Sequence, residues 1–133
     1  MTGNLDLVGD IARDIVQSDE LKDIDWVEIT LVAQVDDDGI TGLFGYIYDE
    51  QGESTPEFPD MDAIDGSVCA YRRWLRKEGD EGFSTMLFQF NRITRRFNVD
   101  FVYGETTRWR VTPTNIDTIA DELRPRLHEA HDA

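Results

Sequence analysis

The chain has 133 residues, of which 28 are Asp or Glu and 13 are Lys or Arg, so its formal net charge is -15 at pH 7. This length fits one domain with a core that needs neither disulfides nor a structural metal, and the single cysteine, Cys69, excludes an internal disulfide framework. The acidic balance argues against direct binding to nucleic acid or to an anionic membrane, because both need clustered Lys and Arg. The N-terminus lacks the features of a signal peptide, and no apolar run approaches the roughly 20 residues that span a bilayer. We therefore expect a soluble, cytoplasmic protein.

The acidic surplus lies in the first half of the chain. Residues 1–71 contain 18 acids and two bases, whereas residues 72–133 contain ten acids and eleven bases. This split predicts a dipolar surface with one strongly electronegative region. Adaptation to high salt predicts acids over the whole surface, which the second half contradicts, and chance in a small domain is a further account. We favour a partner with a basic surface, which the acidic half would attract.

The first elements follow from the spacing of apolar residues. Apolar positions three and four residues apart between Leu5 and Val16 predict an amphipathic helix with Asn4 as its N-cap. Alternation over residues 26–35 predicts a strand that is packed on one side. The Asp-Asp-Gly run at residues 37–39 predicts a hairpin turn, because Gly39 adopts a positive φ easily.

The middle of the chain predicts a strand, a loop and a helix. A strand over residues 40–48 contains two glycines, which indicate a bulge. Residues 49–62 contain two prolines and read as an exposed loop. A helix over residues 63–78 follows, with its apolar stripe at three- and four-residue spacing and Gly79 as its end.

The last part of the chain predicts two strands, over residues 83–90 and 97–103, joined by a polar turn. Residues 108–112 predict a short edge strand, and Pro113 opens a third helix. The predicted fold is α+β: a single domain over residues 1–133, in the order α-β-β-α-β-β-(β)-α. It has an antiparallel four- to five-stranded sheet with the helices packed on one face.

The sequence carries no recognised catalytic motif: there is no G-x-S-x-G, H-E-x-x-H, C-x-x-C or glycine-rich phosphate loop. We interpret His128 and His131 as unpaired exposed histidines and Cys69 as a small buried hydrophobic residue. The acids at residues 60–65 miss the spacing of a calcium loop and lack its terminal Glu. We therefore predict no enzyme, no metal and no cofactor; a small enzyme with a carboxylate pair is the weakest of the alternatives.

Several segments resemble the YezG/EsaG-like immunity proteins. The segments are DIARDI at 10–15, DWVE at 25–28, the turn at 37–39, WLRKEG at 74–79, FSTMLFQF at 83–90 and FNVDFVY at 97–103. The resemblance covers roughly residues 8–103. Members of this family are acidic cytoplasmic antitoxins that neutralise secreted polymorphic toxins, several of them nucleases, by binding the toxin domain. The resemblance therefore implies a non-catalytic antitoxin.

A nuclease presents a basic cleft to phosphate, and the acids of residues 36–62 are candidates to fill it or to dock beside it. The predicted partner-binding residues are Asp36, Asp37, Asp38, Asp49, Glu50, Glu53, Glu57, Phe58, Asp60 and Asp62. Tyr46, Tyr48 and Phe58 are the candidate aromatic anchors. Alternatively, the two tyrosines are strand residues of the core, and Phe58 packs its loop against the domain.

The predicted partner is thus a toxin with a basic surface, bound by a monomer or weak dimer that contacts neither nucleic acid nor membrane. The alternative function is a small acidic secretion chaperone, which would bind an effector segment through an apolar groove.

Overall fold

The computed structural model describes residues 4–76, 82–104, 115 and 118–125. The elements in chain order are α1 (Asn4–Gln17), β1 (Glu28–Asp36), β2 (Gly39–Tyr48), β3 (Ser54–Thr55), α2 (Met61–Leu75), β4 (Thr85–Asn91), β5 (Phe97–Val102) and α3 (Ile119–Glu122). The predicted α+β class and element order are confirmed. The predicted edge strand at 108–112, the helix start at Pro113, the helix end at Gly79 and the two histidines lie outside the described residues.

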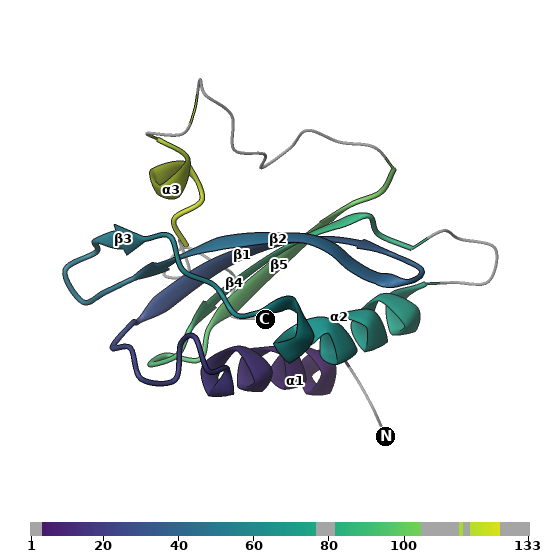
Figure 1. The fold of residues 1–133 in the computed structure, drawn as a ribbon, viewed down its shortest axis with the longest axis horizontal. Helices are drawn as coiled ribbons and strands as arrows, with labels where there is room; N and C mark the ends of the chain where they lie inside the picture. Colours follow the sequence, from purple (N-terminus) through teal and green to yellow (C-terminus); the bar gives the residue numbers. More distant parts are fainter. Residues whose placement is uncertain (1–3, 77–81, 105–114, 116–117, 126–133) are drawn as a thin grey trace.

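The five strands form one antiparallel sheet in the order β3-β2-β1-β4-β5 (Figure 1). Asp36 pairs with Gly39 at the β1–β2 hairpin, and Glu28 pairs with Tyr48 at the other end of the same two strands. Gly39 has φ 132, as the hairpin prediction required. The predicted bulge is present, because the register shifts between Gln34 and Val35.

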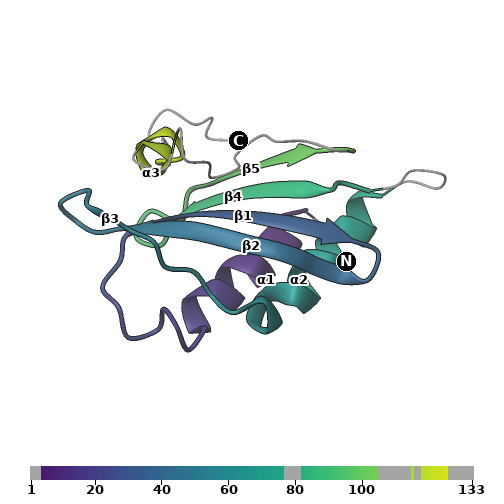
Figure 2. The same ribbon diagram turned by 45° about the horizontal axis from the view of Figure 1, so that its top comes forward.

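Helices α1 and α2 cover one face of the sheet (Figures 1 and 2). Their apolar stripes bury Ile11, Ile15, Ile64 and Val68 completely. The alternating side chains of β1 point into the same cluster, which also includes Phe88 from β4. At roughly 1.5–3 kcal/mol for each large apolar side chain, this burial is the main favourable term for the fold.

Helix α3 lies on the opposite face of the sheet (Figure 2). Two predictions are therefore wrong: that all helices cover one face, and that the strand at residues 26–35 is packed on one side only. On this opposite face α3 buries Val32 and Leu87 together with its own Ile119 and the adjacent Leu123. The helices are therefore not all on one face, and β1 is buried on both sides. The prediction failed because α3 has one short turn of helix, and sequence spacing does not say which face such an element covers.

Polar side chains of the sheet hold the end of α3. Gln89 Nε2 donates to the Leu123 carbonyl oxygen at 2.8 Å, and Thr30 Oγ1 donates to the same oxygen. The Tyr48 hydroxyl donates to the Ala120 carbonyl oxygen at 2.6 Å. The last carbonyl groups of a helix have no partner within the helix, so these bonds satisfy them.

Other boundaries differ by a few residues. Leu5 was predicted in the buried stripe but is 71% exposed, and Leu7 is buried instead. The segment predicted as loop contains the two-residue strand β3, and α2 begins at Met61 within that same segment. Among the described residues, no helix has the length and apolar character needed to cross a membrane.

Candidate functional site

The acids of the β1–β2 hairpin contact basic residues of α2. Arg72 Nη1 lies 2.8 Å from Asp37 Oδ1, and Arg76 Nη1 lies 3.2 Å from the same oxygen. The hydrogen bond from Arg72, together with the charges of both guanidinium groups, lowers the pKa of Asp37 below its ordinary value. Asp36 Oδ1 accepts a hydrogen bond from the backbone of Asp38 and so shapes the turn. The molecule's own cations thus partly neutralise this end.

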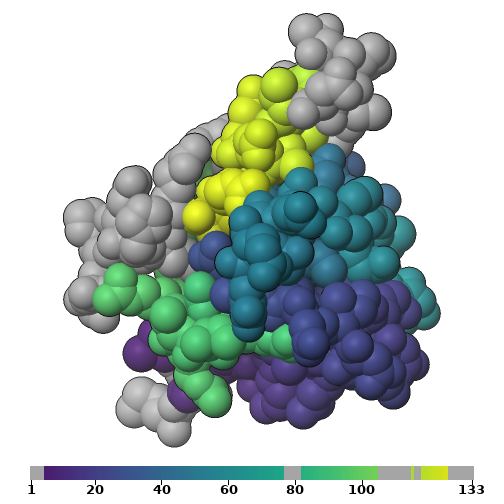
Figure 3. All heavy atoms as spheres, turned by 90° about the vertical axis from the view of Figure 1, so that its left-hand side faces the viewer, coloured from purple at the N-terminus to yellow at the C-terminus, as the bar shows by residue number. Residues whose placement is uncertain are grey.

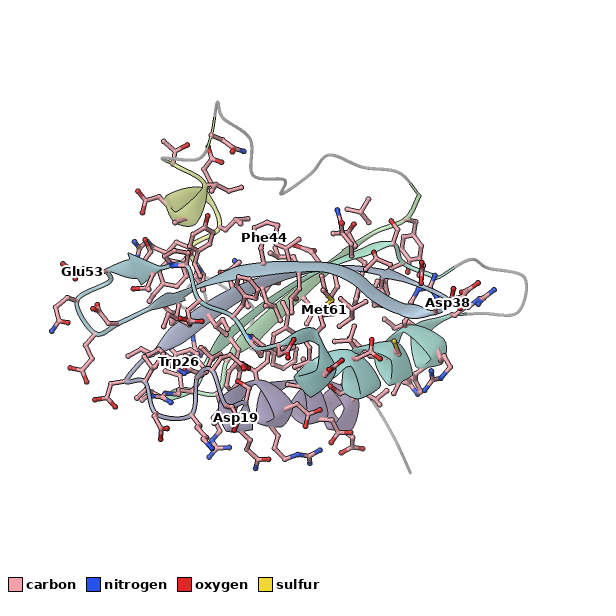
Figure 4. All side chains as sticks on the ribbon, in the orientation of Figure 1. Asp19, Trp26, Asp38, Phe44, Glu53 and Met61 are labelled. Carbon is pink, nitrogen blue, oxygen red and sulfur yellow. The ribbon has the colours of Figure 1, made fainter. Side chains whose placement is uncertain are left out.

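Asp49, Glu50 and Glu53 lie at the opposite end of the sheet, in the β2–β3 turn. Asp62 lies between the two ends, in the first turn of α2, three residues before Asp65, whose Oδ1 accepts a hydrogen bond from the backbone of Ile40 beside the hairpin. The eight residue steps of β1 from Glu28 to Asp36 span about 26 Å at the usual strand rise. The β2–β3 turn follows Tyr48, which pairs with Glu28, so it is separated from the hairpin by this distance. Figure 4 shows the labelled side chains of Asp38 and Glu53 at these opposite ends. The expectation of one electronegative region is therefore wrong in its geometry.

Two segments lie at the end opposite the hairpin, the loop 18–27 after α1 and the β2–β3 turn at 49–53, and a third segment, 57–60, runs from this end towards the start of α2 (Figure 1). Glu20 Oε1 accepts a hydrogen bond from the backbone of Asp60 at 2.8 Å and so ties the first segment to the third. We call this region the loop-end surface (Figure 3). Its carboxylates are Asp19, Glu20, Asp23, Asp25, Asp49, Glu50, Glu53, Glu57 and Asp60.

A cleft of about 510 Å³ lies between loop 18–27, the β2–β3 turn and the β4–β5 hairpin. Asp25 and Glu50 line it together with Asp49, and all three are acidic. Arg92 also lines it, and its guanidinium lies over the Trp26 ring, 4.5 Å from the centroid. The stacking, worth about 1 kcal/mol for a partly exposed pair, fixes this cation in place.

Asp49 organises the turn. Its Oδ1 accepts hydrogen bonds from the backbone N–H groups of Gln51 and Glu53, both at 2.9 Å. A short carboxylate that binds backbone groups two and four residues ahead stabilises a tight turn. Asp49 is therefore positioned for structure, whereas Glu50 and Glu53 are exposed and point their charges to solvent.

Few cations offset the loop-end carboxylates in the part of the chain that the structure describes. Lys22 pairs with Asp19 at 2.9 Å, and this bond raises the pKa of Lys22. Arg124 lies nearby, but it pairs with Asp121 at 3.1 Å and lies over the Tyr48 ring. Among the described ion pairs, Asp19 is the only loop-end carboxylate to have one. This surface therefore presents most of its negative charge to solvent.

The aromatic candidates divide between core and surface. Tyr48 is 1% exposed, and burial raises its pKa to about 12, so it is a core residue and the anchor prediction for it is wrong. Tyr46 is half-buried and packs against the apolar cluster that Val32 and Leu87 form with α3. Phe58 is 36% exposed on the loop-end surface and stays a candidate anchor.

Two exposed apolar residues were missed by sequence reasoning, one at this end and one between the two ends of the sheet (Figure 4). Ile93 at the tip of the β4–β5 hairpin is 69% exposed and lines the cleft, and Met61 at the start of α2 is 40% exposed. An isolated apolar residue inside a polar turn was the available signal for Ile93. The acids of loop 18–27 were also missed, although four acids against one lysine in ten residues was a readable signal.

The reactive groups that the structure describes have structural partners. Cys69 is half-buried with its Sγ 3.7 Å from Asp65 Oδ1, and burial raises the pKa of this thiol and so disfavours the nucleophilic thiolate. Asp65 Oδ1 also accepts from the backbone of Ile40 at 2.9 Å. Within the described ranges, no three His, Cys, Asp or Glu side chains come together as a metal site.

The chain was compared with models of known protein families and with curated proteins, and neither comparison found a match.

Proposed function

We propose that this chain is a non-catalytic acidic immunity protein, an antitoxin that binds and neutralises a cognate secreted toxin with a nuclease-type domain. The observation that carries the proposal is the loop-end surface, where carboxylates from three segments gather with little countercharge. Such a surface complements the basic cleft that a nuclease needs for phosphate. The YezG/EsaG-like pattern in the sequence supports the same function.

The surface supplies charge and shape together. Its field would raise the rate of association with a cationic partner by about 10- to 1000-fold at low salt. Charge alone gives little specificity, and here the cleft and the exposed side chains of Ile93 and Phe58 provide apolar contacts beside the acids. A partner that inserts into the cleft would meet Asp25 and Glu50 on its walls.

The first test is co-expression with the C-terminal domain encoded by the neighbouring gene. An antitoxin restores growth when that domain is toxic, and it co-purifies with it. A toxic neighbouring domain that this chain neither neutralises nor binds contradicts the proposal. A non-toxic neighbour that co-purifies through an extended segment supports the chaperone alternative instead.

The second test locates the interface by association kinetics. The triple variant Asp25→Asn, Glu50→Gln, Glu53→Gln removes three exposed loop-end charges without touching Asp49. We expect its association rate at low salt to fall at least tenfold and its salt dependence to flatten. The matched control is Asp36→Asn with Asp38→Asn, which removes exposed charge at the hairpin end.

The hairpin control should change the association rate much less than the loop-end triple variant. Equal effects per charge removed, three in the triple variant and two in the control, would mean that only total charge matters and that the loop-end surface is not the interface. A larger effect of the hairpin variant would move the interface to the β1–β2 turn, which holds three of the ten residues predicted from the sequence.

A further inference from the structure

An apolar groove of about 440 Å³ runs between α1 and the β4–β5 hairpin. Its α1 wall is formed by residues at helical spacing, which include Leu5, Gly9 and Val16, and its other wall by Phe90 and Phe97. Leu5 is 71% exposed although it is a large apolar residue. The eleven residue steps from Leu5 to Val16 correspond to about 16 Å, or three helical turns.

Gly9 makes the groove open at its centre. Apart from its chain neighbours and the nearby backbone of its own helix, no described atom lies within 4 Å of where a Cβ on Gly9 would stand, and the residue is exposed in the middle of a helix. Glycine weakens a helix interior relative to alanine, so this position lowers the stability of α1. What it provides is a notch in the helix surface, which lets a second backbone approach closely.

Three arginines lie at this groove, although the protein as a whole carries a net charge of -15. Arg13, Arg92 and Arg95 all line the groove. Arg13 is paired with Asp10 at 3.2 Å, and Arg92 is held over Trp26. Arg95 is exposed and has no ion-pair partner among the described residues.

The backbone at Arg95 adds an independent argument. Its φ is 65, and it is the only non-glycine residue with positive φ in the described part of the chain. This conformation suits Gly or Asn, so the turn would form more easily with either of them. An arginine here works against local stability, which indicates that its guanidinium serves another purpose.

We propose that this groove docks an amphipathic α-helix of a partner protein, with carboxylates on the edge that faces Arg92 and Arg95. The apolar stripe of the helix would pack against Leu5, Val16 and Phe97. It would lie beside α1 and extend the helical layer that α1 and α2 begin under the sheet (Figure 1). A helix fits better than an extended strand, because the α1 wall presents side chains in ridges that match another helix.

The occupant has the opposite charge to the partner of the loop-end surface, so the inference goes beyond the proposed function and does not depend on it. A charge-complementary pair of arginines selects carboxylates at the groove edge. The same net charge of -15 repels acidic proteins that lack a matching apolar stripe. Recognition therefore requires both features in one segment.

The test uses a fluorescently labelled, stapled helical peptide of about 14 residues, since shorter free helices are marginal in water. It carries Leu at positions i, i+3, i+4 and i+7 and Glu along one flank. Three variants of the full chain are compared with the parent by fluorescence anisotropy. They are Gly9→Leu, which fills the notch, Arg95→Gly, which removes the guanidinium, and Gly66→Leu as a matched control.

Gly66 is an appropriate control because it is also exposed within a helix and has open space around its Cβ position. Both leucine substitutions should raise the melting temperature, because leucine is a better helix former than glycine. Arg95→Gly should also leave the fold intact, since glycine adopts this φ without strain. A loss of binding in these variants therefore cannot be attributed to unfolding.

We expect Gly9→Leu to weaken peptide binding at least tenfold and Arg95→Gly to weaken it several-fold, with Gly66→Leu unchanged. Equal affinity of the parent and Gly9→Leu for the peptide overturns the proposal. A parent chain that sediments as a dimer, and as a monomer after Gly9→Leu, also overturns it, because a second copy then fills the groove. The proposal is also overturned if a peptide with Lys in place of Glu binds the parent as tightly as the Glu peptide and loses the same affinity in Gly9→Leu.

Discussion

Replacing Arg72 by methionine tests how α2 is attached to the sheet. Arg72 is almost fully buried, and its Nε donates to the Phe83 carbonyl oxygen at 2.8 Å. Its Nη1 donates to Asp37 at 2.8 Å, and its guanidinium packs against Gly82. Methionine keeps much of the aliphatic length but removes every donor. The Phe83 carbonyl then loses this partner in a buried site.

The two contacts differ in their expected contributions to stability. A buried carbonyl left without a hydrogen bond costs about 1–3 kcal/mol. The Asp37 side chain is 71% exposed, so water screens its attraction to Arg72. We therefore expect Arg72→Met to lower the free energy of unfolding by about 2 kcal/mol, most of it from the Phe83 contact. For a chain of this length the melting temperature should fall by roughly 6–10 °C.

Urea denaturation followed by circular dichroism measures this loss, with Asp37→Asn as the control that removes only the ion pair. Asp37→Asn should shift the urea midpoint much less than Arg72→Met. Equal shifts for the two variants would refute the reasoning, because the ion pair would then be the dominant contact. An unchanged midpoint for Arg72→Met would refute the role of the Phe83 hydrogen bond.

Three further predictions concern pH and the turn of the loop-end surface. Arg72 and Arg76 lower the pKa of Asp37 in the folded state. The ionised Asp37 therefore stabilises the fold above its unfolded-state pKa near 4, and this stability is lost as the pH falls through the folded-state pKa. The urea midpoint of Asp37→Asn should therefore drop less than that of the parent between neutral and acid pH. Burial raises the pKa of Tyr48 to about 12. Its neutral hydroxyl therefore stabilises the fold below about pH 10, and this stability is lost as the pH rises towards 12. Tyr48→Phe should lack this alkaline loss of stability in a pH titration followed by circular dichroism. Asp49→Ala removes two backbone hydrogen bonds and should cost about 1 kcal/mol, with faster proteolysis at residues 49–53 as the measurement.

The secondary structure was largely readable from the sequence because it follows local periodicity. The alternation in β1 and the three- to four-residue spacing in α1 depend on neighbours in the chain, and both elements form where they were predicted. The turn at Gly39 was readable for a similar reason, since few residues adopt its φ. The prediction that Leu5 is buried was wrong because the elements that pack against a helix determine which of its apolar residues are buried.

The candidate site was readable in its composition and not in its arrangement. Six of the ten predicted residues lie on the loop-end surface, three lie at the hairpin, about 26 Å from the β2–β3 turn, and Asp62 lies between the two ends on α2. Loop 18–27 was overlooked because it is distant from Asp60 in the sequence, and only the folded chain brings Glu20 of this loop into contact with Asp60. The groove beside α1 was not visible at all, because its two walls come from opposite halves of the chain.

The sequence by itself determined the elements, the large negative charge and its concentration in the first 71 residues. Only the tertiary structure decided which carboxylates face solvent together and which meet a cation, as Asp37 meets Arg72. The physical reason is range. Helix and strand propensity act over a few residues, whereas the field at a surface depends on strand register and helix packing, which bring together charges that are far apart in the chain.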